Sequence, residues 1–231
     1  MKISPLGDGA LTIDLGNTIS LERNTRAISL AERISKRPFA GFIESVPAYA
    51  SVAVHYNVSK VRHAYPEFPT AFDAVKEYVM KAALAADDRR DEETRVVEIP
   101  VDFSADAALD LGVVAEFSGL DQQSVIDLFL SKTYRVYMLG FLPGFAYMGT
   151  VDDRIAIPRR STPRKSVPKG SIGIAGNQTG IYPLESPGGW QIIGRTPLQM
   201  FDPGSEMPCL LGPGDEVRFV TEREESEKVR R

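Results

Sequence analysis

Cysteine and histidine are scarce in this chain of 231 residues, which contains one cysteine and two histidines. The single cysteine, Cys209, excludes an internal disulfide bond and any Cys-x-x-Cys metal or redox site. Because Cys209 stands between Pro208 and Leu210 with no histidine nearby in sequence, we expect an unreactive, buried thiol. His55 and His63 both precede the second half of the chain, which argues against a Ser-His-Asp triad or a histidine metal site there.

Nucleotide-binding signatures and long apolar runs are also missing. The chain has no GxxxxGK[ST] phosphate loop, and the glycines of GSIGIAG at 170–176 are spaced by three, unlike those of GxGxxG. Such glycines favour a close approach of a strand to a second sheet or to a ligand. The N-terminus lacks the apolar run of a signal peptide, and the longest apolar stretch, around 136–148, is interrupted by glycine and proline. We therefore expect a cytoplasmic protein that is not inserted in a membrane.

Strong net charge is absent as well. The chain is 43% hydrophobic and 25% charged, and its net charge of −4 gives no overall attraction to nucleic acid or to an anionic membrane. Its length suits one large or two small domains. Any binding site for an anion must therefore depend on a local arrangement of charges.

Residues 1–88 predict a small α/β domain. Apolar residues recur at helical spacing after Ser20, which can cap a helix, and Thr70 and Asp73 have the spacing of a capping box. Alternating apolar residues predict strands between and before these helices. The expected elements are a strand at 10–15, a helix ending at Pro38, strands at 42–46 and 51–56, and a helix at 70–86.

A run of mixed charges at 87–93 predicts a solvated linker to a second domain at 94–222, and the charged tail at 223–231 is expected to be frayed or disordered. The second domain begins with a strand at 95–101 and helices at 107–117 and 122–132, the latter capped by Asp121. Thirteen of the 19 glycines and ten of the 16 prolines lie between residues 139 and 215. Short strands between such turns predict a closed or sandwich-like sheet.

Positive charge gathers in one segment of this second domain. The 31 residues from Arg154 to Leu184 include six lysines or arginines and no carboxylate. Arginine binds carboxylate or phosphate in two-point geometry, so an anionic small molecule or an acidic partner surface is the expected target. The alternative is a solvated basic loop that pairs with acidic residues elsewhere in the chain.

Polar and aromatic side chains near this segment predict a binding pocket. Amides, a hydroxyl and a further arginine can supply the polar groups, and aromatic rings the apolar wall, although aromatic side chains also pack in cores. The candidate substrate-binding residues are Arg159, Arg160, Arg164, Asn177, Gln178, Tyr182, Arg195, Phe141, Phe145 and Trp190. Tyr147 is a further candidate for the wall.

No residue in this segment is an obvious candidate for proton transfer. Without histidine, general acid-base catalysis would fall to Tyr182, Glu185, Asp202 or a lysine, and none of these has a telling sequence context. Asp202 and Asp215 stand beside glycine and proline and are predicted to stabilise turns. The catalytic residues therefore stay unassigned, no metal site is predicted, and the pocket is better suited to binding than to proton transfer.

Several motifs together resemble one known family. They are PLGDGAL (5–11), SVPAYASVAVHY (45–56), GFLPGFAYMG (140–149), PRRSTPR (158–164), IAGNQTGIYPLESPGGW (174–190) and IGRTPLQMFDP (193–203). The chain resembles, over nearly its whole length, the family that includes the B subunit of 5-oxoprolinase (PxpB), the kinase inhibitor KipI and allophanate hydrolase subunit 1, which shares a carboxyltransferase domain. Ala146-Tyr147-Met148-Gly149 and Lys169 depart mildly from the family pattern, which concerns specificity more than fold.

The resemblance implies an α+β protein with an N-terminal DCoH-like domain and a C-terminal cyclophilin-like β-barrel. It further implies the PxpB component of an ATP-dependent 5-oxoprolinase, a hydrolase that converts 5-oxoproline, ATP and water to glutamate. Such a component works in a hetero-oligomer with KipA/PxpC-like and PxpA-like partners, and ATP is the cofactor of the complex. One alternative is a KipI-like inhibitor of a sensor histidine kinase. Another is a component of the allophanate hydrolase or urea carboxylase type, which the short, free-standing chain disfavours.

Overall fold

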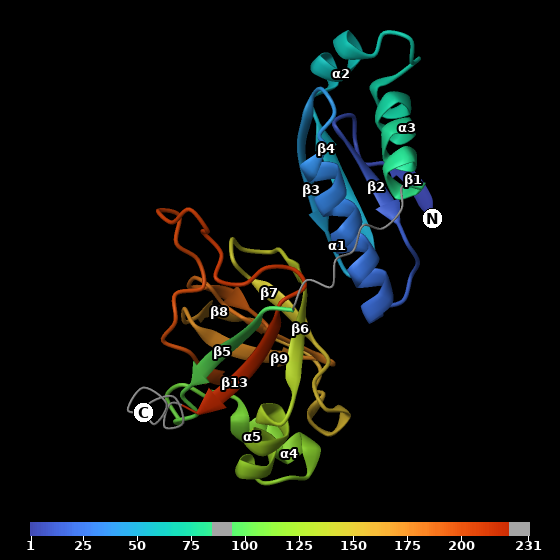
Figure 1. Cartoon of the computed structure of the whole chain (residues 1–231). Helices are drawn as coiled ribbons and strands as arrows, with labels where there is room; N and C mark the ends of the chain where they lie inside the picture. Colours follow the sequence, from blue (N-terminus) through green and yellow to red (C-terminus); the bar gives the residue numbers. More distant parts are fainter. Residues whose placement is uncertain (85–93, 222–231) are drawn as a thin grey trace. The chain divides into compact units, whose positions relative to one another are not determined.

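The computed structural model describes residues 1–84 and 94–221 and divides the chain into two compact units, Met1–Glu93 and Thr94–Arg231 (Figure 1). The predicted linker at 87–93, the last residues of the helix expected at 70–86, and the charged tail lie outside the described residues. Each unit has a mixed α/β composition and a hydrophobic core of its own.

The first unit is a four-stranded antiparallel sheet with helices packed on one face. Its strands are β1 (Lys2–Pro5), β2 (Ala10–Asp14), β3 (Phe42–Pro47) and β4 (Ser51–Tyr56), in the spatial order β1-β2-β4-β3. Its helices are α1 (Leu21–Lys36), α2 (Val58–Ala64) and α3 (Ala71–Leu84). Alternate residues of β2 and β4 are buried against α1 and α3, as the period of a strand requires.

Local sequence signals explain most of these elements. The Ser20 hydroxyl accepts a hydrogen bond from the backbone N–H of Arg23, and the Thr70 hydroxyl accepts one from that of Asp73, so both predicted caps are confirmed. Strand β1 and helix α2 were not predicted. Helix α2 is only seven residues long and has one fully buried side chain, Val61, so its sequence carries no apolar stripe to detect.

The second unit is a nearly closed barrel built on one seven-stranded sheet. In chain order its strands are β5 (Val96–Val101), β6 (Thr133–Leu139), β7 (Ala146–Gly149), β9 (Ser171–Ala175), β10 (Gln178–Ile181), β12 (Gln191–Arg195) and β13 (Glu216–Thr221). Their spatial order is β12-β9-β10-β7-β6-β13-β5. Asp102, just after β5, and Arg195, at the end of β12, exchange two backbone hydrogen bonds of 2.8 and 3.0 Å. These bonds join the two edge strands, which removes exposed sheet edges as the sequence predicted.

Smaller elements flank the barrel. Helices α4 (Leu111–Ser118) and α5 (Gln122–Leu130) pack together, a 3-10 turn covers Asp153–Ile155, and β8 (Arg164–Val167) pairs with β11 (Ser186–Gly188). The Asp121 cap of α5 is confirmed by a hydrogen bond from the backbone of Ser124. The predicted helix at 107–117 begins only at Leu111, because the backbone N–H of Asp110 donates to Ile192 of β12 and is not available to a helix.

Asp110 ties α4, strand β12 and the basic segment together. Its buried carboxylate accepts hydrogen bonds from Arg160, at 2.9 Å, and from both terminal nitrogens of Arg164, at 2.7 and 2.6 Å. It also accepts one of 2.7 Å from the backbone N–H of Ile192. Four donors on one buried carboxylate compensate its loss of water, which makes the cluster costly to break from either side.

We predict that Asp110→Asn destabilises the barrel unit by about 3–5 kcal/mol, because it leaves two partly buried guanidinium groups without a counter-charge. Urea unfolding followed by the fluorescence of Trp190, the chain's single tryptophan, reports on this unit. Asp127→Asn, the same change at an exposed position of α5, is the control and should shift the midpoint far less. Equal losses in the two variants would contradict a special role for the Asp110 cluster.

We also predict that Gly170→Ala costs about 2–5 kcal/mol. Gly170 has a φ of +81°, and an added Cβ would lie 2.2 Å from the backbone oxygen of Thr196. The left-handed conformation costs a side chain about 1–2 kcal/mol, and overpacking adds about 1–3 kcal/mol. Gly176→Ala is the matched control, since Gly176 has a φ of +59° but open space around its Cβ position. The prediction fails if both variants unfold at the same urea concentration.

Candidate functional site

Phe145 is the centre of an aromatic cluster on the barrel unit. Its ring lies 4.8 Å from that of Tyr147, 5.3 Å from Tyr182, 5.5 Å from Trp190 and 5.7 Å from Phe141, measured between ring centroids. Three of these contacts are close to perpendicular, the edge-to-face arrangement that aromatic rings prefer. The structure thus brings together the predicted residues Phe141, Phe145, Tyr182 and Trp190, with Tyr147 beside them.

This cluster lies on the outer face of the sheet and is separate from the barrel interior. Phe145, Tyr182 and Trp190 belong to a small apolar cluster that shares no buried residue with the main core. Glycines form its floor: a Cβ on Gly173 would lie 2.9 Å from Trp190, and one on Gly180 2.9 Å from the Phe145 ring. The close approach predicted for the glycine-rich strand is therefore made by aromatic side chains.

Arg159 is the cation of this face. Its guanidinium carbon lies 5.8 Å from the centroid of the Trp190 ring, a cation–π contact, and its side chain is exposed. Within the described residues 1–84 and 94–221, Arg159 makes no ion pair with a carboxylate. A guanidinium held over an aromatic ring with its hydrogen-bond donors unpaired is suited to bind an anionic group.

Arg160 and Arg164 differ from Arg159 because the structure gives both an internal partner, Asp110. The sequence segment from Arg154 to Leu184 contains no carboxylate, but the fold supplies one from a position 50 residues earlier than Arg160. Arg160 and Arg164 therefore follow the alternative interpretation, in which the basic segment pairs with an acidic residue elsewhere in the chain. Their proposed role changes from binding an anion to holding the loop that carries Arg159.

The remaining predicted residues lie elsewhere on the barrel. Asn177 is in the β9–β10 turn, and Gln178 begins β10, roughly 13 Å from Tyr182 at the rise of a strand. Gln178 shares the outer face with Gly180, whereas Asn177 lies beyond the strand. The side chain of Arg195 donates to the backbone oxygen of Asp106 at the barrel closure. Gln178 is thus a diagonal neighbour of Tyr147, which pairs with Gly180 on the same face, whereas Asn177 and Arg195 lie apart from the aromatic cluster.

The Phe141 backbone has an uncommon conformation. Its φ is +68°, and the backbone N–H of Leu142 donates to the oxygen of Gly140 at 2.8 Å, which makes Phe141 the centre of a γ-turn. The Phe141 side chain is 63% exposed. An exposed aromatic residue held in a strained turn is a mark of functional surfaces.

The tyrosines of the cluster are hydrogen-bonding groups, not bases. Burial raises the pKa of Tyr182, and a backbone hydrogen bond with Trp190 opposes this only in part. Burial also raises the pKa of Tyr147, opposed by the charge of Arg159. Both phenols are therefore protonated at neutral pH. Asp202 and Asp215 accept hydrogen bonds from the backbone of Gly204 and Gly212, so their predicted role in turns is confirmed.

Other kinds of site receive less support from the described residues. Among them, no group of three or more His, Cys, Asp or Glu side chains is placed to hold a metal ion. Cys209, expected to be buried, is a half-buried free thiol. No helix in the described part of the chain is both long and apolar enough to cross a membrane.

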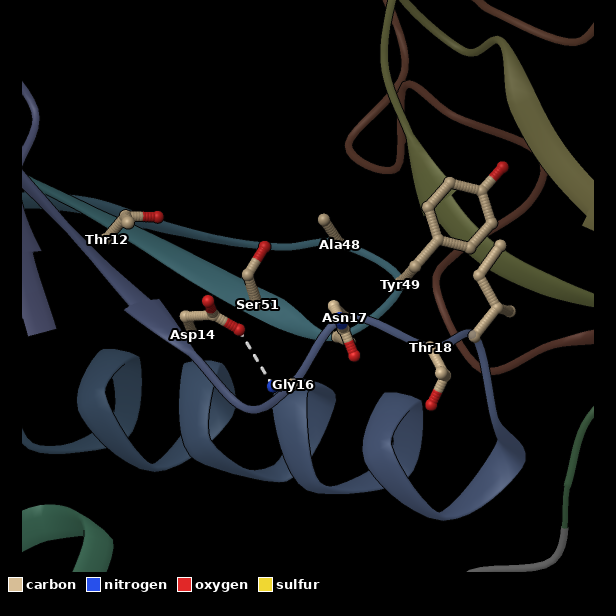
Figure 2. A pocket seen from close by; sticks show the side chains of 10 residues that line it. Thr12, Asp14, Gly16, Asn17, Thr18, Ala48, Tyr49 and Ser51 are labelled. Carbon is tan, nitrogen blue, oxygen red and sulfur yellow. Dashed lines mark hydrogen bonds between the residues drawn. The ribbon is translucent and has the colours of Figure 1, made fainter. Parts of the chain in front are cut away.

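The first unit contains a separate open hollow of about 370 Å³ (Figure 2). Thr12 and Asp14 of β2 lie beside Ser51 of β4 at one side, and Asn17 and Tyr49 come from the loops at the end of these strands. Its polar groups are mostly hydroxyls, with one carboxylate, and no predicted binding residue lines it. We place the candidate site on the aromatic face because, among the described residues, that face is where an unpaired cation meets an aromatic cluster.

Sequence reasoning missed Asp110 altogether. It stands inside the segment 107–117 that was predicted as a helix, and nothing in the local sequence connects it with arginines 50 and 54 residues later. A buried carboxylate at a helix start resembles an ordinary cap. Only the folded chain shows that Asp110 divides the arginines into two that are paired and one that is not.

Comparisons with known proteins agree on one family. The model of the carboxyltransferase domain, subdomains C and D, matches residues 1–211. The chain is 43% identical to the B subunit of 5-oxoprolinase from Bacillus subtilis, over 95% of this chain and 92% of that protein. It is 38% identical to the protein of the same name from Escherichia coli O157:H7, over 95% of each chain.

Solved structures support the same grouping. TTHA0988 is 36% identical with a TM-score of 0.78, over 92% of this chain but 39% of its own length. The uncharacterised protein PH0987 of Pyrococcus horikoshii is 44% identical with a TM-score of 0.55, over 96% of this chain and 99% of its own. From these matches we conclude that the chain belongs to the carboxyltransferase subdomain C and D family, alongside the B subunit of 5-oxoprolinase.

Proposed function

We propose that this chain is the PxpB component of an ATP-dependent 5-oxoprolinase, which opens the lactam of 5-oxoproline with ATP and water to give glutamate. The observation that carries the proposal is the 43% identity to the B subunit of a 5-oxoprolinase over nearly the full length of both chains. The proposed partners are a KipA/PxpC-like subunit and a PxpA-like subunit. ATP is proposed as the cofactor of the complex, without assignment to this chain.

The chemistry of the aromatic face supports this substrate. 5-Oxoproline has one carboxylate and a small, flat lactam ring. Arg159 offers unpaired donors for a carboxylate, and the half-buried ring of Tyr147, which packs on the buried Trp190, offers an apolar surface for the lactam.

The same face also supports a site shared between subunits. Arg159 and Phe141 are exposed, so a ligand bound there would remain partly in contact with water. The raised pKa values keep the phenols of Tyr147 and Tyr182 protonated, so neither tyrosine is the base of the reaction. We infer that this chain supplies one wall of the active site and that a partner supplies the catalytic groups.

Other assignments stay predictions. The chain is 28% identical to the urea amidolyase of Lachancea kluyveri, but it covers 13% of that protein, so a urea-carboxylase role has weaker support. Inhibition of a sensor histidine kinase is not tested by the geometry. The DCoH-like and cyclophilin-like descriptions of the two units and the cytoplasmic location are proposals of the same kind.

Reconstitution tests the proposed function. We expect glutamate to form from 5-oxoproline and ATP when this chain is mixed with the KipA/PxpC-like and PxpA-like subunits of the same genome. Leaving this chain out should abolish the reaction, because one wall of the site is then missing. Glutamate and ADP are measured together. Equal rates with and without the chain would refute the proposal.

Arg159→Ala tests the site within the reconstituted complex. The loss of one charge-assisted hydrogen bond, about 1.5–3 kcal/mol, should lower kcat/KM for 5-oxoproline by about ten- to a hundredfold. Arg154→Ala is the matched control, because Arg154 is an exposed arginine of the same segment that pairs with Asp152. Trp190 fluorescence checks that both variants fold. Similar kcat/KM values for the two variants would remove Arg159 from the site.

A further inference from the structure

Helix α4 presents a row of exposed apolar side chains. Val113 and Phe117 are one turn apart on one side of the helix, and Leu109 stands two residues before the helix begins. Their exposed fractions are 43%, 46% and 59%. Seven large apolar side chains of the described second unit are at least 40% exposed, and three of the seven, Leu109, Val113 and Phe117, form this single row, the α4 row.

The surroundings of the α4 row are acidic. Residues 104–131 include five carboxylates and no lysine or arginine. Asp110 faces inward, but Asp106, Glu116, Asp121 and Asp127 are exposed. An apolar row with an acidic border is unlike ordinary scattered surface leucines and matches a partner segment of opposite charge.

The α4 row begins beside the Asp110 cluster. Leu109 directly precedes Asp110, whose carboxylate binds the arginines that follow Arg159 in sequence. The start of α4 and the loop that carries Arg159 are thus tied to one carboxylate. In the related TTHA0988, the matched region is 39% of the length, so that single polypeptide contains further sequence beyond the part that corresponds to this chain.

We propose that the α4 row docks the subunit that completes the active site, through a helix of that subunit with an apolar stripe flanked by lysine or arginine. This inference rests on the proposed function, because it takes the KipA/PxpC-like subunit as the occupant. Val113 and Phe117, at spacing i, i+4 within α4, form a short ridge of the kind that packs into the groove of another helix. The acidic border of the row favours basic flanks on that helix and makes binding weaker at high salt.

The test measures the affinity of the full chain for the KipA/PxpC-like subunit of the same genome by biolayer interferometry. Val113→Asp and Phe117→Asp should each raise Kd by at least about tenfold, because a charge is placed in the centre of an apolar contact. Met207→Asp is the matched control, since Met207 is 69% exposed in the segment before β13 and lies outside the α4 row. Urea unfolding followed by Trp190 fluorescence checks that all three variants fold.

The outcomes separate this inference from the proposed function. If the wild-type complex forms and is active but Phe117→Asp binds as tightly as Met207→Asp, the α4 row is not the docking surface and the proposed function stands. If the wild-type chain neither binds nor is needed for activity, both fail. If light scattering shows the chain alone to be a dimer that Phe117→Asp dissociates, with partner binding unchanged, the row serves self-association and the inference is overturned.

Discussion

The carboxylate of Asp110 is the contact on which the arrangement of the barrel unit depends. It is buried, and its two oxygens accept hydrogen bonds from Arg160, Arg164 and the backbone of Ile192. A loop rich in proline and arginine would otherwise repel itself and remain in water. Because one inward carboxylate binds two of its arginines, the loop is held against the barrel, and the start of α4 is fixed by the same interaction.

The two adjacent arginines Arg159 and Arg160 have different surroundings. The backbone N–H of Arg160 donates to the oxygen of Gly189 at 2.8 Å, which holds this segment beside the one that carries Trp190. Arg160 meets Asp110, and Arg159 lies over Trp190 on the outer face. The same two-residue motif, Arg-Arg, thereby supplies one structural cation and one that is available to a ligand.

The sequence was sufficient for features that depend on local patterns. Helix caps at Ser20, Thr70 and Asp121, and the turns at Asp202 and Asp215, follow from side chains that bond their own neighbourhood. The closed sheet followed from the density of short strands and turns. The role of Asp110 and the division between Arg159 and Arg160 did not, because they depend on contacts 50 residues apart. Asn177 and Arg195 were placed with the pocket by nearness in sequence, although a turn and the closure of the barrel hold them elsewhere. Gln178 does share a face of the sheet with Tyr147.

Charged and aromatic side chains that find no partner within the described residues are candidates for contact with other molecules. Among the described residues, Arg160, Arg164 and Arg154 are paired with carboxylates, whereas Arg159 is not. The aromatic cluster is largely buried except at Phe141, whose strained turn costs about 1–3 kcal/mol and keeps an apolar ring in water. A fold gains no stability from such an exposed ring unless something covers it. Phe141 and Arg159 thus share with the α4 row an exposure that the proposed contact with a partner subunit would cover.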